Sequence, residues 1–140
     1  MKVVFDANVV LNCIRAVDDE SRAAIGVAKN LRHVIVVCER LLNEYRRALV
    51  RGGPRHLFAY YDRLVMQILP REFMERNDDP VVLIQFGPEE DRFHMQLAIN
   101  ARCDYHVSWD RAVLREAENM ARFGVTELNP TAYVAANRGV

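Results

Sequence analysis

The chain has 140 residues, 51% of them hydrophobic and 27% charged, and its nineteen basic side chains balance its nineteen acidic ones. This length and composition are typical of one globular domain and exclude a disordered or collagen-like chain. Because the net charge is zero, any attraction to nucleic acid must come from a local patch rather than a global field. We expect a single domain over residues 1–140.

Three cysteines, Cys13, Cys38 and Cys103, are widely spaced and odd in number, which fits neither a disulfide framework nor a CxxC zinc site. Asp6 interrupts the N-terminal apolar run after three residues, so there is no signal-peptide core. The longest apolar stretch, residues 34–38, is too short to span a bilayer. We therefore expect a soluble protein in a reducing cytoplasm, without membrane attachment.

Residues 2–5 are a short β-branched and aromatic run, and the periodic apolar residues after Asp6 predict a strand that leads into a helix. Residues 21–31 predict a second helix, and the apolar residues 33–37 predict a second buried strand. Helical periodicity over residues 40–50 ends at a stop signal in residues 52–54. Residues 57–69 predict a further amphipathic helix, which Pro70 ends.

Turn chemistry over residues 77–80 precedes an apolar run, residues 81–86, that predicts a strand, and residues 87–91 form a second turn. The remaining elements are a helix over 93–100, a strand over 105–108, a helix over 111–122, a strand over 125–128 and a helix over 130–136. Strands separated by helices imply βαβ crossovers, so we predict an α/β fold: a three-layer α/β/α architecture with a mainly parallel central sheet. Ligands bind beyond the carboxyl ends of such strands.

Acidic residues occupy the positions where sites form in this fold. Asp6 follows the first strand, Glu44 lies one turn into the helix after the second strand, Asp91 lies at a helix start, and Asp110 follows Ser108. Converging carboxylates repel one another at a cost of several kcal/mol if they stay ionised and buried. Divalent cations remove that conflict, and oxygen ligands suit Mg²⁺ or Mn²⁺, which can cleave phosphodiesters as a pair roughly 3.5–4 Å apart.

Each of these acids also has a purely structural interpretation. Asp6 and Asp110 could be helix N-caps. Glu44 could form surface ion pairs with Arg40 and Arg47, which lie four residues before it and three after it. The acids of residues 89–91 could simply compensate the helix dipole, and nothing in the sequence chooses among them.

Arginines account for seventeen of the nineteen cations, which favours bidentate recognition of phosphate, although a high-GC genome gives the same bias. Arg40, Glu44, Arg47 and Arg51 share one helix face, so Arg40 and Arg47 could bind substrate phosphates beside a metal site, or form a solvated face. Candidate stacking residues for RNA bases are Tyr60, Tyr61 and Trp109. We interpret the four scattered histidines as structural.

Four segments of the chain resemble the PIN-domain nucleases, particularly their toxin-like (VapC-type) subgroup. They are VVFDANVVL at residues 3–11, LLNEYRRAL at 41–49, EEDRFHMQLAINARCDYHVSWD at 89–110 and LNPTAYV at 128–134. The resemblance implies that Asp6, Glu44, Asp91 and Asp110 are catalytic metal ligands, with Asn8 and Ser108 supporting them. Trp109 stands where family members commonly carry a small residue, and Glu90 or Asp91 could face the metal.

The resemblance implies Mg²⁺- or Mn²⁺-dependent endonucleolytic cleavage of RNA, a small antitoxin protein as partner, and a homodimer. An alternative from another class is a catalytically silent PIN-like module that binds RNA or an antitoxin. Dinucleotide, P-loop and GxSxG enzymes are excluded because their motifs are missing from the sequence.

Overall fold

The computed structural model describes residues 1–15, 17–51, 58–78 and 82–139, without the side chains of Phe58 and Tyr61. Across these residues a sheet of parallel strands has the order β3-β2-β1-β4-β5. The strands are β1 (Lys2–Phe5), β2 (Val34–Val37), β3 (Met74–Arg76), β4 (Tyr105–Val107) and β5 (Thr126–Leu128). The fold is the predicted three-layer α/β/α architecture, with a sheet that is entirely parallel.

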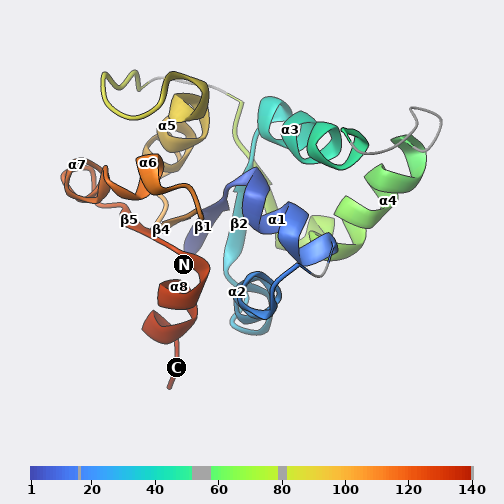
Figure 1. Cartoon of the computed structure of the whole chain (residues 1–140). Helices are drawn as coiled ribbons and strands as arrows, with labels where there is room; N and C mark the ends of the chain where they lie inside the picture. Colours follow the sequence, from blue (N-terminus) through green and yellow to red (C-terminus); the bar gives the residue numbers. More distant parts are fainter. Residues whose placement is uncertain (16, 52–57, 79–81, 140) are drawn as a thin grey trace.

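Helices cover both faces of this sheet (Figure 1). One side carries α5 (Arg92–Asn100), which contacts β1, β2 and β4, together with α6 (Arg111–Leu114) and α7 (Ala117–Ala121). The other side carries α1 (Ala7–Ile14), α2 (Asp19–Asn30), α3 (Glu39–Val50) and α4 (Phe58–Ile68), and α8 (Pro130–Ala136) packs on α2 and β4. Two short 3-10 helices, η2 (Arg71–Phe73) and η3 (Glu89–Asp91), precede β3 and α5.

Strand register places two polar side chains next to each other inside the fold. Val4, His106 and Glu127 are paired side by side across β1, β4 and β5. Since successive residues of a strand point to opposite faces, Phe5 points to the other side, where its ring meets Tyr133 of α8 at 5.7 Å. His106 and Glu127 are both buried, and they lie on the face that α5 covers.

Strand order also determines where a ligand fits. From β1 the chain runs to β2 and β3 in one direction across the sheet, whereas β4 and β5 lie in the other direction. The carboxyl ends of β1 and β4 therefore meet at the point where the order reverses, which is where open parallel sheets bind ligands. The Asp6 N–H continues this pairing by donating to the Val107 carbonyl at 2.9 Å.

The prediction of a strand over residues 81–86 is wrong for the described residues 82–86, which form a loop. Leu83 is 78% exposed, and the Ile84 N–H donates to the side-chain oxygen of Gln96 at 3.0 Å instead of to a strand. The edge position of the sheet is taken by β3, which pairs with β2 and was not predicted. The prediction from apolar composition alone therefore placed the edge strand at the wrong residues.

The helix predicted over residues 111–122 is divided into α6 and α7 by a turn at Arg115 and Glu116. The helix predicted from residue 21 begins at Asp19, because the Asp18 carboxylate accepts from the Ser21 N–H at 2.6 Å and caps it. The stop signal at residues 52–54, the start of the helix at residue 57 and residues 79–81 lie outside the described residues.

The three cysteines are free thiols, as their spacing predicted. Within the described ranges, no helix is both long enough and apolar enough to cross a membrane.

A first prediction concerns Tyr45, which is 1% exposed and whose hydroxyl donates to the Phe5 carbonyl at 2.5 Å. Tyr45→Phe leaves this buried carbonyl without that donor, so we expect the free energy of unfolding to fall by about 1–3 kcal/mol. Urea denaturation monitored by circular dichroism measures the change. An unfolding free energy within about 0.5 kcal/mol of the parent protein, the usual range for neutral surface changes, would show that the bond contributes nothing.

Candidate metal centre

Asp6 lies at the carboxyl end of β1 and begins α1. Its Oδ1 accepts from the Ala7 N–H at 2.7 Å, and its Oδ2 accepts from Ser108 Oγ at 2.7 Å and from Asn8 Nδ2 at 3.3 Å. The residue is only 6% exposed. Asp6 is therefore the N-cap of α1, which is the structural interpretation given above. Hydrogen bonds from Asn8 and Ser108 also fix its carboxylate at the sheet edge.

The turn after β4 is tied to the same carboxylate. Ser108 Oγ donates to Asp6 and accepts from the Asp110 N–H at 3.0 Å, while Asn8 Oδ1 accepts from the Trp109 N–H at 3.1 Å. Asp110 Oδ1 caps α6 by accepting from the Ala112 N–H at 2.9 Å. Asn8 and Ser108 thus join the ends of β1 and β4.

Asp91, at the start of α5, completes a tight group with Asp6 and His94. Asp91 Oδ1 is 3.1 Å from His94 Nε2, which is 3.5 Å from Asp6 Oδ1. One ligand atom from each of these three residues lies within 4.8 Å of the other two. Glu90 is exposed at the rim of the same cavity, so Asp91 is the acid of this pair that meets Asp6.

Two further predicted acids lie around this group rather than within it. The Asp110 side chain lies close enough to Asp91 to lower the pKa of that carboxyl. Glu44 lines the cavity that opens onto Asp6 and Asp91, and among the described residues its carboxylate takes part in none of the ion pairs. The structure therefore gathers the four predicted acids at one end of the sheet, with Asp6 and Asp91 in closest contact.

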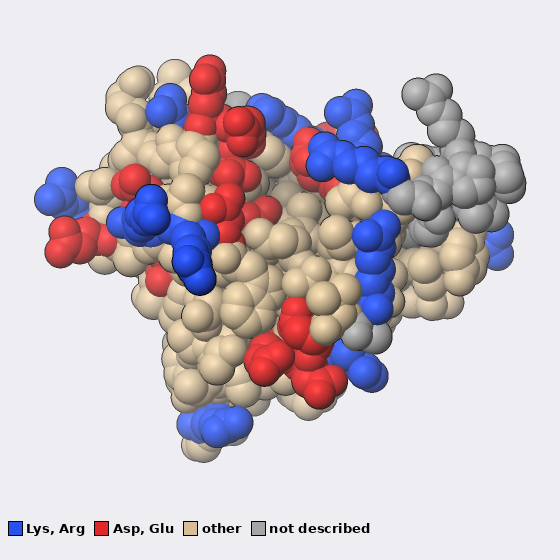
Figure 2. Space-filling model, viewed as in Figure 1, with Lys and Arg blue, Asp and Glu red and all other residues tan. Residues whose placement is uncertain are grey.

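The cavity has a volume of about 500 Å³ and has a mixed charge (Figure 2). Acidic side chains gather in the hollow between α5 and α3, and basic side chains stand on its α3 side. Arg40 of α3 and Arg51, which follows the end of α3, both line the cavity. Arg47 is exposed and does not belong to the described lining, so of the two arginines predicted to bind substrate only Arg40 lies at the cavity.

Behind the centre, His94 begins a buried chain of polar side chains. Its Nδ1 lies 2.8 Å from His106 Nε2, with the two ring planes within 3° of each other. His106 Nδ1 in turn lies 2.8 Å from Oε2 and 2.7 Å from Oε1 of Glu127. His94 is 2% exposed and His106 is fully buried, so a continuous contact runs from Asp6 and Asp91 to β5.

His94 and His106 are scattered along the sequence, but the structure brings them into contact, and it places His94 in a group that could hold a metal ion. A local signal existed for the first, because Asp91 and His94 are three residues apart on a helix and so share a face. No local signal joins His94 to His106, which meet only because α5 packs on β4. His33 has the expected structural role, with its Nδ1 2.6 Å from the Tyr133 hydroxyl, and His56 lies outside the described residues.

Local electrostatics follow these contacts. Contact with His94 holds the pKa of Asp91 below its usual range against the opposing effect of burial, and the Asp110 side chain lowers it further. Burial disfavours a charged His106, but the adjacent Glu127 carboxylate outweighs burial and raises the pKa of His106. Burial raises the pKa of Glu127. The Asp91 carboxylate therefore stays ionised, and the pKa of His106 depends on its buried neighbour Glu127.

The donor set fits a divalent cation. Two carboxylates and one imidazole nitrogen converge within 4.8 Å, and the nearest described arginine that lines the cavity, Arg40, is turned onto the Phe93 ring at 4.1 Å from its centroid. Carboxylate and imidazole donors together suit Mn²⁺ and its neighbours, whereas carboxylates alone suit Mg²⁺.

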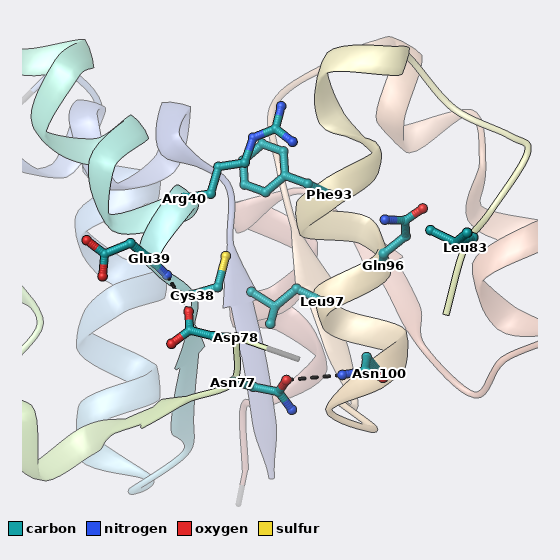
Figure 3. Close-up of a pocket in the computed structure, with 10 residues that line it drawn as sticks. All are labelled: Cys38, Glu39, Arg40, Asn77, Asp78, Leu83, Phe93, Gln96, Leu97 and Asn100. Atoms are coloured by element: carbon teal, nitrogen blue, oxygen red, sulfur yellow. Dashed lines mark hydrogen bonds between the residues drawn. The ribbon is translucent and has the colours of Figure 1, made fainter. Parts of the chain in front are cut away.

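A second cavity, of about 400 Å³, adjoins the first (Figure 3). Arg40 and Phe93 line both cavities and stand at the boundary between them. The amides of Asn77, Gln96 and Asn100 line the groove further along α5. The groove thus combines an aromatic ring with amide groups beside the metal centre.

The candidate stacking residues lie elsewhere. The Trp109 indole N–H donates to Ser21 Oγ at 2.8 Å, so this ring links the β4 turn to α2. Tyr60 is 52% exposed on α4, and the Tyr61 side chain lies outside what the structure describes. Phe93, which sequence reasoning did not single out, is the ring at the centre.

In a comparison with protein families, the family model described as PIN domain matches residues 2–112. The matched segment contains Asp6, Glu44, Asp91 and Asp110 and ends just after the last of them. Searches among curated proteins and among solved structures found no match.

A second prediction follows from the repulsion among these carboxylates. A cation that binds only the folded chain raises its stability by about 2.7 kcal/mol at one hundred times its dissociation constant, so added Mn²⁺ or Mg²⁺ should raise the melting temperature. Asp6→Asn should remove this increase while the variant stays folded. Differential scanning fluorimetry over a metal titration measures both, and an equal increase in the variant would show that the ion binds elsewhere.

Proposed function

Since the chain belongs to the PIN-domain family, we propose that it is a divalent-metal-dependent endoribonuclease. PIN domains are generally metal-dependent nucleases, and nuclease-type function is the general assignment that membership supports. The observation that carries the proposal is the convergence of Asp6, Asp91 and His94 at the ends of β1 and α5. A catalytically silent module has no need for such a convergence of ionised groups.

In the proposed mechanism, Asp6, Glu44, Asp91 and Asp110 are the acids that hold Mg²⁺ or Mn²⁺. When bound, the ions supply an activated water and stabilise the leaving oxygen of the phosphodiester. The chain's own contribution is preorganisation. Ser108 and Asn8 fix the Asp6 carboxylate through hydrogen bonds of 2.7 and 3.3 Å, so little ordering remains when metal and substrate enter.

Substrate phosphates are proposed to contact the arginines of the α3 side. Arg40 and Arg51 line the cavity opposite the carboxylates, where guanidinium groups can bind phosphate oxygens in a bidentate manner. Arg47 lies exposed on the same helix and would contact the backbone outside the cavity. Cations on one wall and acids on the other direct the backbone past the centre.

The RNA class is proposed from the groove beside the centre. Unpaired bases are recognised by stacking on aromatic or guanidinium planes and by hydrogen bonds to their edges. The Arg40 and Phe93 pair offers such planes at the boundary of the two cavities, and Asn77 and Gln96 offer amide groups within the groove. Single-stranded RNA fits this arrangement better than a duplex, whose bases are stacked inside.

The biological setting remains a proposal that rests on the resemblance of the sequence motifs. We propose that the protein is the toxin of a cytoplasmic toxin–antitoxin pair, that it forms a homodimer and that a small antitoxin protein blocks the metal centre. The open cavity that holds Asp6 and Asp91 is the surface that such an inhibitor would cover.

A third prediction tests the catalytic acids. Asp6→Asn and Asp110→Asn keep the side-chain shape and remove the charge, so each should lower Mn²⁺-dependent cleavage of single-stranded RNA by more than the about 10–100-fold typical of residues outside the ligand sphere. Cleavage of a fluorescent oligonucleotide, with and without metal, measures the rate.

The matched control for that experiment is Asp104→Asn, which changes an acid at the opposite end of β4 whose carboxylate accepts from the Lys2 N–H at 2.8 Å. This variant should cleave at the parent rate. If the parent protein bound RNA without cleaving it under any metal, the silent binding module would replace the nuclease as the function. Unchanged cleavage by Asp6→Asn would eliminate the mechanism.

A fourth prediction separates substrate binding from metal binding. In an Asp110→Asn background, Arg40→Ala should weaken RNA binding and reduce the slope of log affinity against log salt by about 1, as loss of one phosphate contact does. Phe93→Leu should weaken binding with the slope unchanged, because stacking releases no counterion. Fluorescence anisotropy at several salt concentrations measures both.

Arg122→Ala, at an exposed position of the turn after α7, is the control for charge loss alone. An equal reduction in affinity and slope for Arg122→Ala and Arg40→Ala would contradict a specific role for Arg40.

A further inference from the structure

The row of contacting side chains from His94 through His106 to Glu127 extends further into the core than a metal site needs. The His106 and Glu127 side chains are adjacent because β4 and β5 pair these two residues directly, and α5 places His94 against the same face. The Glu127 side chain is fully buried, with Oε1 2.7 Å and Oε2 2.8 Å from His106 Nδ1. Two imidazoles and a carboxylate thus occupy core positions that apolar residues could fill.

Such a chain determines which nitrogens carry protons. An ionised Glu127 only accepts hydrogen bonds, so a neutral His106 presents Nδ1–H to it and its Nε2 then carries a lone pair. That lone pair accepts from His94 Nδ1–H, 2.8 Å between the nitrogens. Neutral His94 is then left with a lone pair on Nε2, which is the atom that faces Asp6 and Asp91.

A lone pair directed at two carboxylates is unfavourable unless a positive charge lies between them. We propose that Glu127 and His106 are positioning residues that orient His94 so that its unprotonated Nε2 ligates the cation of the centre, which gives the centre a preference for Mn²⁺ over Mg²⁺. This inference rests on the proposed function and adds a ligand and a metal preference to it. It assigns roles to two residues that never touch the substrate.

The metal preference follows from ligand chemistry. Imidazole nitrogen is a softer donor than carboxylate oxygen, and Mg²⁺ binds oxygen ligands almost exclusively. A histidine that ligates a metal through one nitrogen almost always donates its other ring N–H to an acceptor, which fixes the tautomer and raises ligand basicity. Here the acceptor is a second imidazole, and Glu127 supplies the negative charge behind it.

The decisive variant is Glu127→Gln, because an amide can donate as well as accept. A Gln side chain can donate to His106 Nδ1, which reverses the chain and leaves His94 with Nε2–H pointing at the carboxylates. We expect this variant to lose about 10–100-fold in Mn²⁺ affinity, the usual effect of removing the partner of a metal-ligating histidine. Its Mg²⁺ affinity should fall less. Isothermal titration calorimetry with each metal alone measures this difference.

A spectroscopic readout tests ligation directly. Pulsed electron paramagnetic resonance of Mn²⁺ bound to the parent protein should reveal hyperfine coupling to a histidine nitrogen, identified by ¹⁵N-histidine labelling. His94→Gln should remove this coupling, and Glu127→Gln should weaken it. The matched control is Glu75→Gln, which neutralises a carboxylate on β3 that is paired with Lys2 and should leave coupling and both affinities unchanged.

The outcomes separate this inference from the proposed function. If the parent protein binds Mn²⁺ and cleaves RNA in an Asp6-dependent manner but displays no histidine nitrogen coupling, the inference is overturned and the nuclease stands. If the protein binds neither metal at the Asp6 site, both fail. Should Glu127→Gln not fold, the labelled parent protein and His94→Gln still decide whether His94 is a ligand.

Discussion

The 2.7 Å hydrogen bond from Ser108 Oγ to Asp6 Oδ2 joins the carboxyl ends of the two strands between which the sheet reverses its order. A parallel sheet brings these ends together whatever their sequence, but the hydrogen bond fixes which oxygen of Asp6 is occupied. Its other oxygen, Oδ1, caps α1 and faces His94. The direction in which this carboxylate presents itself to a ligand is therefore set by the backbone topology of β1 and β4.

Charge balance around the Asp6 carboxylate explains why buried histidine and glutamate side chains lie behind it in the core. Each ionised acid brought to the site disfavours the next, and among the described residues the ion pairs join Asp6 to no arginine. Positive charge can therefore come from an imidazole or from a metal ion at close range. The buried chain behind His94 links that balance to Glu127, a residue of the last strand.

The sequence predicted what depends on local pattern and missed what depends on packing. The strand before Asp6 and the turn from Ser108 to Asp110 are strong local signals, and the structure places both at one edge of the sheet. The edge strand β3 was missed because its half-exposed residues, Met74–Arg76, carry no apolar pattern. His106 escaped notice because its neighbours come from another helix and another strand, and no spacing along the chain encodes them.

One helix connects the metal centre with the groove. Asp91, the N-cap of α5, and His94 are one turn apart and face the sheet end, whereas Phe93, Gln96 and Asn100 lie along a neighbouring face of α5 and line the groove. A rotation of α5 that moved the residues of the metal centre would therefore also move the residues that line the groove. Because α5 is packed against β1, β2 and β4, the core holds the helix in the one orientation that serves both the metal centre and the groove.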